Sequence, residues 1–487
     1  MKEILVLILF LSLILTGCTN VVDTSSLISS TYIDQTSGET YFSSEEDLIQ
    51  TINGADISTF TIVFQSDAPE YTKNAAEYIQ EQILLRTGVE LNVCSDDSEK
   101  YDIINEIVVG ETNREISRKL DAELNGVEFS LLSDGANVAL EGNYFSIAGA
   151  AYYFINTYIT GKNFSVTIPD ATTVCTPIQK ETKNYIIMIG DGMGVNHTKL
   201  FESEMSPTLL AEYTDGEDIF YGYLFPYSAL SRTNSLTGTT DSAAGATALA
   251  TGYKTYNGYI GMDRTGKPVP SIVELLGEKG FSTAVLTTDQ AVGATPAAFT
   301  SHALDRYDSE AISFSQYETK SRYNTKIEGM NYSFLGAGVD LLCEEIKETL
   351  LTLSENETGF FLMYEEAKID KYSHDNDLSN TFRALLRFNQ AISTIMEYVF
   401  YNPETMVIIT ADHETGGLQK SSSTSPSVFT YTSEGHTSVD VPVFVYGKGG
   451  EIFDKKTIEN IQIPKTLAAF LGEKMQGYEN KKFPALK

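Results

Sequence analysis

The sequence predicts an α/β protein in which a small α/β domain precedes a parallel-sheet α/β/α sandwich. Two observations support this fold class. From residue 184 onward, short apolar runs alternate with segments of helical character, and these runs are apolar throughout instead of at every second residue. Continuously apolar strands that alternate with helices are typical of a parallel sheet covered on both faces.

The first 18 residues have the pattern of an export signal. Lys2 is followed by an apolar run over residues 4–11, which is too short for the roughly 20 residues that span a bilayer. The closing motif Leu15-Thr16-Gly17-Cys18 resembles the lipidation box of bacterial lipoproteins. That resemblance implies a protein that is extracytoplasmic and lipid-anchored to the bacterial membrane through Cys18. An ordinary cleaved signal with a chance cysteine is the alternative.

Charge and cysteine content exclude two classes of protein. The net charge is −32, from 66 acidic and 34 basic residues, which argues against nucleic acid as a partner because its affinity depends on Lys and Arg. An acidic protein that acts on anionic substrates needs local positive charge, which metal ions supply. Besides Cys18, three cysteines remain, and this odd number excludes a disulfide framework. Whether Cys94 pairs with Cys175 stays open.

Four segments are predicted along the chain. Residues 1–18 form the signal, 19–54 a polar tether, 55–175 the small domain and 184–487 the large domain. In the small domain we expect strands over residues 59–64 and 106–110, a helix ending at Gly88, a hairpin over 129–140 and a helix over 146–158. This domain weakly resembles the accessory domain before the catalytic barrel of several glycoside hydrolases, and packing is the favoured role.

In the large domain, polar side chains that can bind metals accompany the predicted strands. The strands are expected over residues 185–189, 283–287, 360–364, 407–410 and 443–446. Four carboxylates and three histidines follow the first, third and fourth strands or precede the fifth: Asp191, Glu365, Asp370, His374, Asp412, His413 and His436. Since ligands bind beyond the carboxyl ends of parallel strands, these side chains should converge. Oxygen and imidazole ligands in this ratio suit zinc together with magnesium.

Ser242 is the candidate nucleophile. Small residues with high helix propensity follow it, and Gly252 suits the end of that helix. Ser242 would then begin the helix, where the peptide dipoles favour an alkoxide and a bound phosphate. A coordinated metal would make the hydroxyl more acidic still.

Residues 184–487 resemble the alkaline phosphatase family. Six segments agree with the family in order and approximate spacing: Gly190-Asp191-Gly192-Met193-Gly194, Asp241-Ser242-Ala243-Ala244, Ala294-Thr295-Pro296-Ala297-Ala298, Ile369-Asp370-Lys371 with His374, Thr410-Ala411-Asp412-His413-Glu414-Thr415-Gly416-Gly417, and Gly435-His436-Thr437. The resemblance implies metal-dependent hydrolysis of small phosphate monoesters through a phosphoserine at Ser242, with broad-specificity phosphate release outside the cytoplasm.

The resemblance also implies three metal sites, two for zinc and one for magnesium. The first zinc would be bound by Asp370, His374 and His436. The second would be bound by Asp191, Asp412 and His413, and would also contact Ser242. The magnesium ligands would be Asp191, Thr295 and Glu365.

Three further residues match family positions around the phosphate. Arg306 falls where the family places an arginine that clamps phosphate, and Asp241 would hold that arginine through a charge-assisted hydrogen bond. Lys371 matches family members in which a lysine approaches the phosphate through water.

Two departures from the family pattern matter. Many members have Asp or His two residues before the threonine of the third metal site, where this chain has Gly293, so magnesium could be weak, replaced or absent there. Asp289 turning toward that place is a less favoured alternative. Only 22 residues separate His413 from His436, so the insertion that often caps the site and aids dimerisation is mostly missing. A homodimer is therefore doubtful.

Other functions were weighed against a phosphomonoesterase. A phosphodiesterase of the same superfamily remains an alternative, whereas a sulfatase needs a Pro and an Arg that are missing after Ser242. A non-catalytic surface lipoprotein that binds phosphate, metal or glycan is disfavoured because it would not need the nucleophile. His197 and His302 match no metal position and are interpreted as structural, and Glu366 and Glu414 as solvated or supporting residues.

Overall fold

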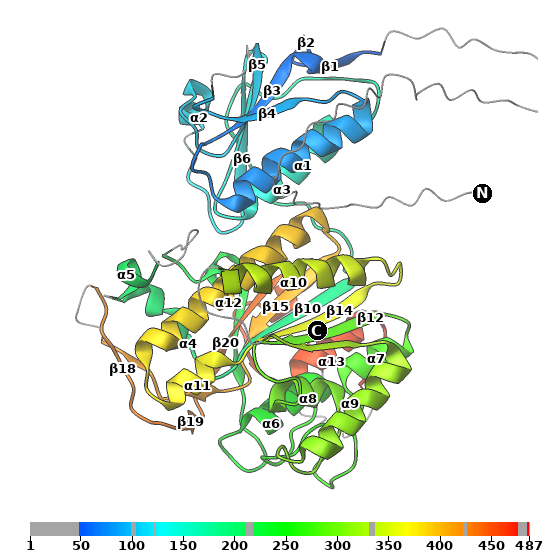
Figure 1. Ribbon diagram of the computed structural model, residues 1–487, viewed down its shortest axis with the longest axis vertical. Helices are drawn as coiled ribbons and strands as arrows, with labels where there is room; N and C mark the ends of the chain where they lie inside the picture. The colour runs from blue at the N-terminus through cyan, green and yellow to red at the C-terminus, as the bar shows by residue number, and fades with distance from the viewer. Residues whose placement is uncertain are drawn as a thin grey trace, which may run out of the picture. The chain divides into compact units, whose positions relative to one another are not determined.

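The computed structural model describes residues 48–98, 104–120, 122–203, 205–210, 218–330, 337–421, 426–475 and 485–486. Cys18, the predicted signal and most of the predicted tether lie outside these residues. Residues 49–487 form one compact unit, and this unit contains two large sheets (Figure 1). The sheets fall in the ranges predicted for the small and large domains, and the division into two domains stays a prediction.

The larger sheet has eight strands in the order β13-β12-β14-β10-β15-β20-β11-β21. Their bounds are β10 (Asn184–Gly190), β11 (Tyr227–Arg232), β12 (Ser282–Thr287), β13 (Lys326–Gly329), β14 (Phe360–Glu366), β15 (Thr405–Thr410), β20 (Val441–Tyr446) and β21 (Thr457–Glu459). All five strands predicted for the large domain are present. They are β10, β12, β14, β15 and β20, and each is buried along nearly its whole length.

The predicted α/β fold with a parallel sheet is confirmed, and one strand of that sheet runs in the opposite direction. β20 runs antiparallel to both of its neighbours, β15 and β11, whereas the other pairings in this sheet are parallel. A parallel partner needs a long crossover, usually through a helix. The described residues between β15 and β20 instead form short ribbons, with bounds β16 (Glu414–Thr415), β17 (Gln419–Lys420), β18 (Phe429–Thr430) and β19 (His436–Thr437).

Helices cover both faces of the larger sheet (Figure 1). One face packs against α10 (Ala337–Ser354) and α12 (Leu378–Tyr401), and the other against α6 (Ser242–Thr251), α7 (Ile272–Glu278), α8 (Ala294–Thr300) and α13 (Gln462–Phe470). Strand β10 shows why: Ile186 and Met188 face the first core, and Ile187 and Ile189 face the second. A strand apolar on both sides needs both layers. The remaining helices of this region are α4 (Val195–Thr198), α5 (Ser206–Leu210), α9 (Ser309–Tyr323) and α11 (Lys368–His374).

The smaller sheet has six strands in the order β4-β3-β5-β7-β6-β9. Its elements are β3 (Phe60–Phe64), α1 (Glu70–Thr87), β4 (Asn92–Ser95), β5 (Asn105–Val109), α2 (Glu115–Lys119), β6 (Phe129–Asp134), β7 (Asn137–Gly142), α3 (Ser146–Tyr158) and β9 (Thr173–Cys175). The predicted strands, helices and hairpin are all found here. α1 ends at Gly88, which takes the left-handed conformation (φ 80°) that a glycine tolerates best.

Two expectations about the small domain are settled by its strand pairing. β1 (Gln50–Ile52) pairs with β2 (Ala55–Asp56) and β8 (Phe164–Val166), so the last residues of the predicted tether 19–54 belong to the folded part. Cys94 and Cys175 lie on β4 and β9, at opposite edges of the six-stranded sheet. Strands are spaced by roughly 4.8 Å, so these cysteines are too far apart to pair, and no cysteine of the described part forms a disulfide.

None of the described helices is both long enough and apolar enough to cross a membrane.

A buried ion pair fixes the end of β14 to α12. Arg387 donates from Nε to Glu366 Oε2 at 2.7 Å and from Nη2 to Glu366 Oε1 at 2.6 Å. Both side chains are 1% exposed or less, so Glu366 is not solvated as one interpretation of the sequence held. Thr288 Oγ1 and the Lys368 amide also donate to Glu366, which satisfies the buried carboxylate. Glu366 thereby links β12, β14, α11 and α12.

Arg387→Met should therefore destabilise the protein strongly, because it leaves the Glu366 charge buried without a partner. We expect a loss of about 3–5 kcal/mol, measured as a lower urea midpoint at constant slope. Arg322→Met is the matched control, since its ion pair with Glu278 is mostly exposed and is worth less than about 1 kcal/mol. Equal midpoints for the two variants would contradict the anchoring role of Arg387.

Candidate metal centre and nucleophile

The predicted metal ligands meet at the carboxyl ends of three adjacent strands. Asp191 follows β10, Glu365 lies near the end of β14, and Asp412 with His413 follows β15. Asp191, Asp412 and His413 each offer one ligand atom, and these atoms lie within 4.8 Å of one another. His413 Nε2 is 3.4 Å from Asp191 Oδ1 and 3.3 Å from Asp412 Oδ2. The set predicted for the second zinc is therefore brought together by the sheet itself.

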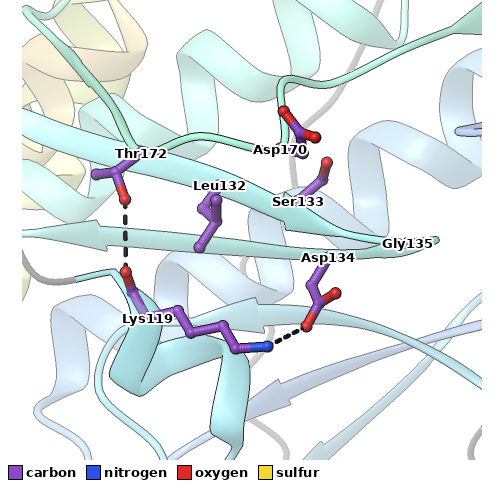
Figure 2. A pocket seen from close by; sticks show the side chains of 7 residues that line it. All are labelled: Lys119, Leu132, Ser133, Asp134, Gly135, Asp170 and Thr172. Carbon is purple, nitrogen blue, oxygen red and sulfur yellow. Dashed lines mark hydrogen bonds and ion pairs between the residues drawn. The ribbon is translucent and has the colours of Figure 1, made fainter.

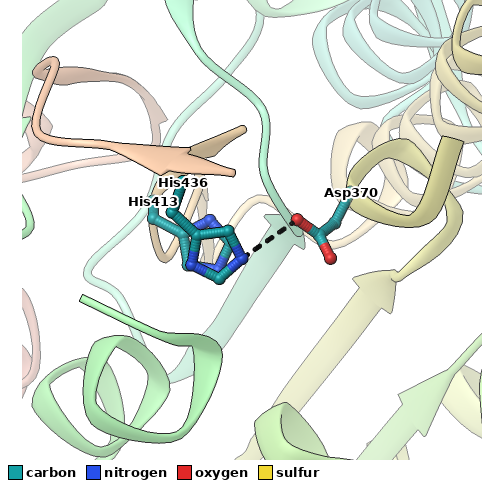
Figure 3. A group of neighbouring side chains, drawn as sticks. All are labelled: Asp370, His413 and His436. Carbon is teal, nitrogen blue, oxygen red and sulfur yellow. Dashed lines mark ion pairs between the residues drawn. The ribbon is translucent and has the colours of Figure 1, made fainter. Parts of the chain in front are cut away.

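A second group lies directly beside the first. Ligand atoms of Asp370, His413 and His436 also fall within 4.8 Å of one another, and Figure 3 shows the two imidazoles overlying each other and facing Asp370. Their ring centroids are 3.6 Å apart. His374 joins this group, with Nε2 3.4 Å from Asp370 Oδ1 and 3.1 Å from His436 Nε2. The residues predicted to bind the first zinc are therefore brought together as well, and His413 belongs to both groups of candidate ligands.

Helix α11 explains how Asp370 and His374 reach the same place. The two residues are four positions apart and so project from one face of the helix. Gly192 lets the loop after β10 approach this helix, because a Cβ at position 192 would lie 2.8 Å from the Asp370 Cα. Gly192 also has a φ of 74°, which favours glycine.

In each of the three histidines of the centre, a neighbouring residue contacts Nδ1, the ring nitrogen that faces away from the carboxylates. His436 Nδ1 lies 2.8 Å from the Thr240 carbonyl oxygen and His374 Nδ1 lies 2.5 Å from the Glu434 carbonyl oxygen. A carbonyl can only accept, so in the neutral form of both rings Nδ1 carries the proton and Nε2 has the lone pair that a metal would bind. His413 Nδ1 contacts Thr415 Oγ1 at 3.2 Å. These contacts orient Nε2 of all three rings toward the carboxylates, as metal ligands require.

The electrostatics of this place call for cations. Burial, and then the charge of neighbouring carboxylates, raises the pKa of both Asp191 and Asp412 well above the usual range. Burial likewise raises the pKa of Glu365 to about 7. Burial lowers the pKa of His413 well below its usual value, so this imidazole is neutral and free to bind a metal. Among the described residues, Asp191 Oδ1, Asp412 Oδ2 and Thr295 Oγ1 are buried without a hydrogen bond. Such a donor set fits divalent metal ions.

Ser242 begins helix α6, as the sequence predicts. Asp241 is the N-cap, and its Oδ1 accepts a hydrogen bond from the Ala244 amide at 3.0 Å. Ser242 Oγ is 3.2 Å from His413 Nε2, so the hydroxyl lies against the metal ligands, and its side chain is almost completely buried. Gly245 permits this approach, because a Cβ there would lie 2.7 Å from the Asp412 carbonyl oxygen.

Asp241 holds Arg306 close to Ser242, the candidate nucleophile. Its Nη1 donates to Asp241 Oδ2 at 3.1 Å, and its amide donates to the Gly258 carbonyl at 2.9 Å. The Gly258 amide in turn donates to Asp241 Oδ2 at 3.0 Å. Asp241 therefore caps α6 with one oxygen and orients the guanidinium with the other.

Thr295 and Glu365, two of the residues predicted for the third site, lie close to each other. Thr295 lies in the first turn of α8, and its hydroxyl is near enough to Glu365 to offset part of the rise in the Glu365 pKa without forming a well-aligned hydrogen bond. Thr287 Oγ1 donates to Glu365 Oε2. Lys371 forms an ion pair with Asp289, Nζ to Oδ2 at 2.5 Å, a contact that the sequence did not predict. From the sequence, Asp289 was only a less favoured candidate for the place left by Gly293.

The supporting role of His197 was not identifiable from the sequence. His197 is fully buried, and burial lowers its pKa to about 3, so it is neutral as expected of a structural histidine. Its Nδ1 accepts from the Gly194 amide at 3.1 Å, and its Nε2 contacts Ser373 Oγ at 3.1 Å. His197 thus ties the loop of Asp191 to helix α11. Its sequence spacing gives no such signal, since Ser373 is 176 residues away.

A separate hollow lies on the small domain (Figure 2). Its volume is about 440 Å³, and it is lined by Lys119, Leu132, Ser133, Asp134, Gly135, Asp170 and Thr172. Lys119 is paired with Asp134 at 2.5 Å, and the lining contains neither histidine nor cysteine. The residues that line this hollow include no convergent set of catalytic groups.

Comparisons with known proteins agree with the geometry. A model of the alkaline phosphatase family matches residues 182–342 and 329–431. Alkaline phosphatase 4 of Bacillus subtilis is 29% identical over 364 residues, which cover 63% of this chain and 75% of the relative. Alkaline phosphatase 3 of the same organism is 26% identical over 349 residues, covering 61% and 72%.

Solved structures show the same fold. The alkaline phosphatase from the Antarctic bacterium TAB5 superposes with a TM-score of 0.52 at 26% identity, covering 61% of this chain and 99% of that one. The relatives support a phosphatase-type hydrolase, and the family implies divalent metal ions, for which the two groups around His413 are candidate sites. The chain belongs to the alkaline phosphatase family.

Proposed function

We propose that this protein hydrolyses phosphate monoesters through a phosphoserine at Ser242. The observation that supports this most directly is the position of Ser242 Oγ, 3.2 Å from His413 Nε2 at the N-terminus of α6, with Arg306 held close by through Asp241. A serine hydroxyl beside metal ligands and a helix N-terminus suits attack on phosphorus. The guanidinium supplies a planar fork for two phosphate oxygens.

The reaction divides into two displacements. Ser242 Oγ forms a bond to phosphorus while the bond to the leaving alcohol breaks, and water then breaks the Ser242–phosphorus bond and releases phosphate. Arg306 binds the non-bridging oxygens, and Asp241 keeps its guanidinium in place. The N-terminal amides of α6 favour the negative charge that gathers there. Divalent metals, when bound, make the serine hydroxyl more acidic and neutralise the charge of the leaving oxygen.

Zinc and magnesium are the metals that we propose for the centre. Asp370, His374 and His436 would hold one zinc, and Asp191, Asp412 and His413 the other, because mixed imidazole and carboxylate sets suit zinc. The all-oxygen set of Asp191, Thr295 and Glu365 suits magnesium. We also propose an extracytoplasmic protein that is anchored through Cys18 and acts on small phosphate monoesters, with no nucleic-acid partner.

A phosphodiesterase of the same superfamily is the alternative that the experiments must separate. Arg306 bears on the choice between the two, since its positive charge favours a monoester, which is a dianion at alkaline pH, over a diester, which is a monoanion. Hydrolysis of p-nitrophenyl phosphate and of bis-p-nitrophenyl phosphate by the metal-loaded protein tests the proposal. A higher kcat/KM for the diester would overturn it.

Ser242→Ala should abolish p-nitrophenyl phosphate hydrolysis, with kcat falling by about 10³-fold or more because no nucleophile remains to form the covalent intermediate. Ser309→Ala is the matched control: Ser309 also begins a helix after an aspartate N-cap, but lies on α9, where its side chain is exposed. It should keep full activity. An active Ser242→Ala protein would show that Ser242 is not the nucleophile.

Arg306→Lys should keep the positive charge but lose the planar fork. We expect kcat/KM for p-nitrophenyl phosphate to fall by about 10–100-fold, and inhibition by inorganic phosphate to weaken in parallel. A variant with wild-type phosphate inhibition would contradict a clamping role for Arg306.

Removal of metals should make stability fall as pH rises from 6.5 to 8. In the metal-free protein, the hydrogen bond with Asp370 raises the pKa of His374 to about 9, and burial raises that of Glu365 to about 7. Both keep protons in the folded state that the unfolded chain has released, so stability is lost as pH rises through this window. Bound zinc would replace the proton of His374, which belongs to one of the proposed zinc sets.

The measurement is the urea midpoint at pH 6.5 and at pH 8, with zinc and after chelation. The stabilisation by zinc should be larger at pH 8 than at pH 6.5. The same difference at both pH values would argue against metal binding by these protonated groups.

A further inference from the structure

Gly293 has no side chain, and another residue fills the space beside it, next to the predicted third cation site. A Cβ at position 293 would lie 3.5 Å from Asp289 Oδ2, so the carboxylate of Asp289 already occupies the space into which a side chain at 293 would project. Position 293 is the N-cap of α8 and lies two residues before Thr295. A carboxylate is therefore present at this place, although it comes from the loop that precedes α8.

The neighbours of Asp289 connect it to the other residues of that site. Its amide donates to Thr287 Oγ1 at 3.0 Å, and the same hydroxyl donates to Glu365 Oε2. Its Oδ2 is 2.5 Å from Lys371 Nζ, on the helix that also carries Asp370. Besides burial, the charges of Asp289 and Lys371 act on the pKa of Glu365 in opposite directions, which places both charges near that carboxyl.

An ordinary surface ion pair would not account for this arrangement. The side chain of Asp289 is 26% exposed and lies close to Lys368 as well as Lys371, and the backbone amide of Asp289 donates to the threonine hydroxyl that also holds Glu365. Mg²⁺ keeps several of its waters when it binds to proteins, so its sites need outer acceptors as well as direct ligands. Outer partners of this kind typically change metal affinity by about 10–100-fold.

We propose that Asp289 is the outer carboxylate of the third cation site, which orients Lys371 and accepts hydrogen bonds from the waters of a bound Mg²⁺. Asp289 is a positioning residue on the loop that precedes α8. It supplies the carboxylate that Gly293, which has no side chain, cannot supply. The inference rests on the metal-dependent hydrolase proposed above, and assigns to this chain a cation site completed by a residue outside the family's matching motifs.

Binding of Mn²⁺ in place of Mg²⁺ tests this directly. Zinc-loaded protein is titrated with Mn²⁺, and free Mn²⁺ is measured by its electron paramagnetic resonance signal, with Mg²⁺ as competitor. Asp289→Asn should weaken the binding of both Mn²⁺ and Mg²⁺ by about 10–100-fold and leave the zinc content at the wild-type value. Asp134→Asn is the matched control, because it removes another Asp–Lys ion pair of 2.5 Å, with Lys119 on the small domain. It should bind both ions like wild type.

A second substitution tests whether the two positions serve one site. Gly293→Asp in the Asp289→Asn background should recover affinity for Mn²⁺, since φ at position 293 is −56°, which L-residues adopt. The added Cβ lies 3.0 Å from the Gln290 carbonyl oxygen, so that carbonyl must shift by a few tenths of an ångström. A double variant that binds Mn²⁺ no more tightly than Asp289→Asn would contradict the idea that positions 289 and 293 serve the same site. Three results would overturn the proposal. The Asp289→Asn variant could bind Mn²⁺ with unchanged affinity, it could lose zinc together with Mn²⁺, or the wild-type protein could bind neither Mn²⁺ nor Mg²⁺.

The outcome is independent of the proposed reaction. Cation binding is measured without substrate, so a protein that fails to hydrolyse phosphate esters can still support or refute the role of Asp289. Conversely, an active enzyme whose Asp289→Asn variant binds Mn²⁺ normally would keep the phosphatase proposal and lose this one.

Discussion

Buried negative charge at one edge of the larger sheet is the constraint on which the site depends. Asp191, Asp412 and Glu365 end three adjacent strands, and burial raises the pKa of each. Ionised carboxylates out of contact with water are costly unless cations accompany them. Neutral His413 between the carboxylates, the N-terminus of α6 and the guanidinium of Arg306 all fit an edge at which divalent cations and an anionic phosphate balance each other.

The scaffold keeps this edge in place by close approach and by buried pairing. Gly192 and Gly245 bring backbone against Asp370 and Asp412 at distances that no side chain would allow. The ion pair between Glu366 and Arg387 then fixes the end of β14 to α12, one residue after Glu365. Sites that stand on strands and paired helices are held more closely than sites on loops alone.

The small domain has its own sheet and core, and its hollow offers no catalytic chemistry. β1 shows that the folded part begins before residue 55, because a strand of three residues there pairs with β8 more than 100 residues later. Polar composition suggested a tether over these residues, but composition does not register a strand whose stability comes from a distant partner. The physiological use of this domain is a separate question from the chemistry of the large one.

The family resemblance implied the contact between Asp241 and Arg306. The sequence by itself determined the apolar strands, the start of α6 at Ser242, and the spacing that puts Asp370 and His374 on one helical face. These features follow from local periodicity, from capping, and from the rule that the carboxyl ends of parallel strands share an edge. Only the tertiary structure decided the reversed direction of β20, the position of His413 within both ligand groups, and the pairing of Asp289 with Lys371. Each depends on contacts between residues far apart in the chain, and residue type and spacing carry no information about which distant partner a side chain meets.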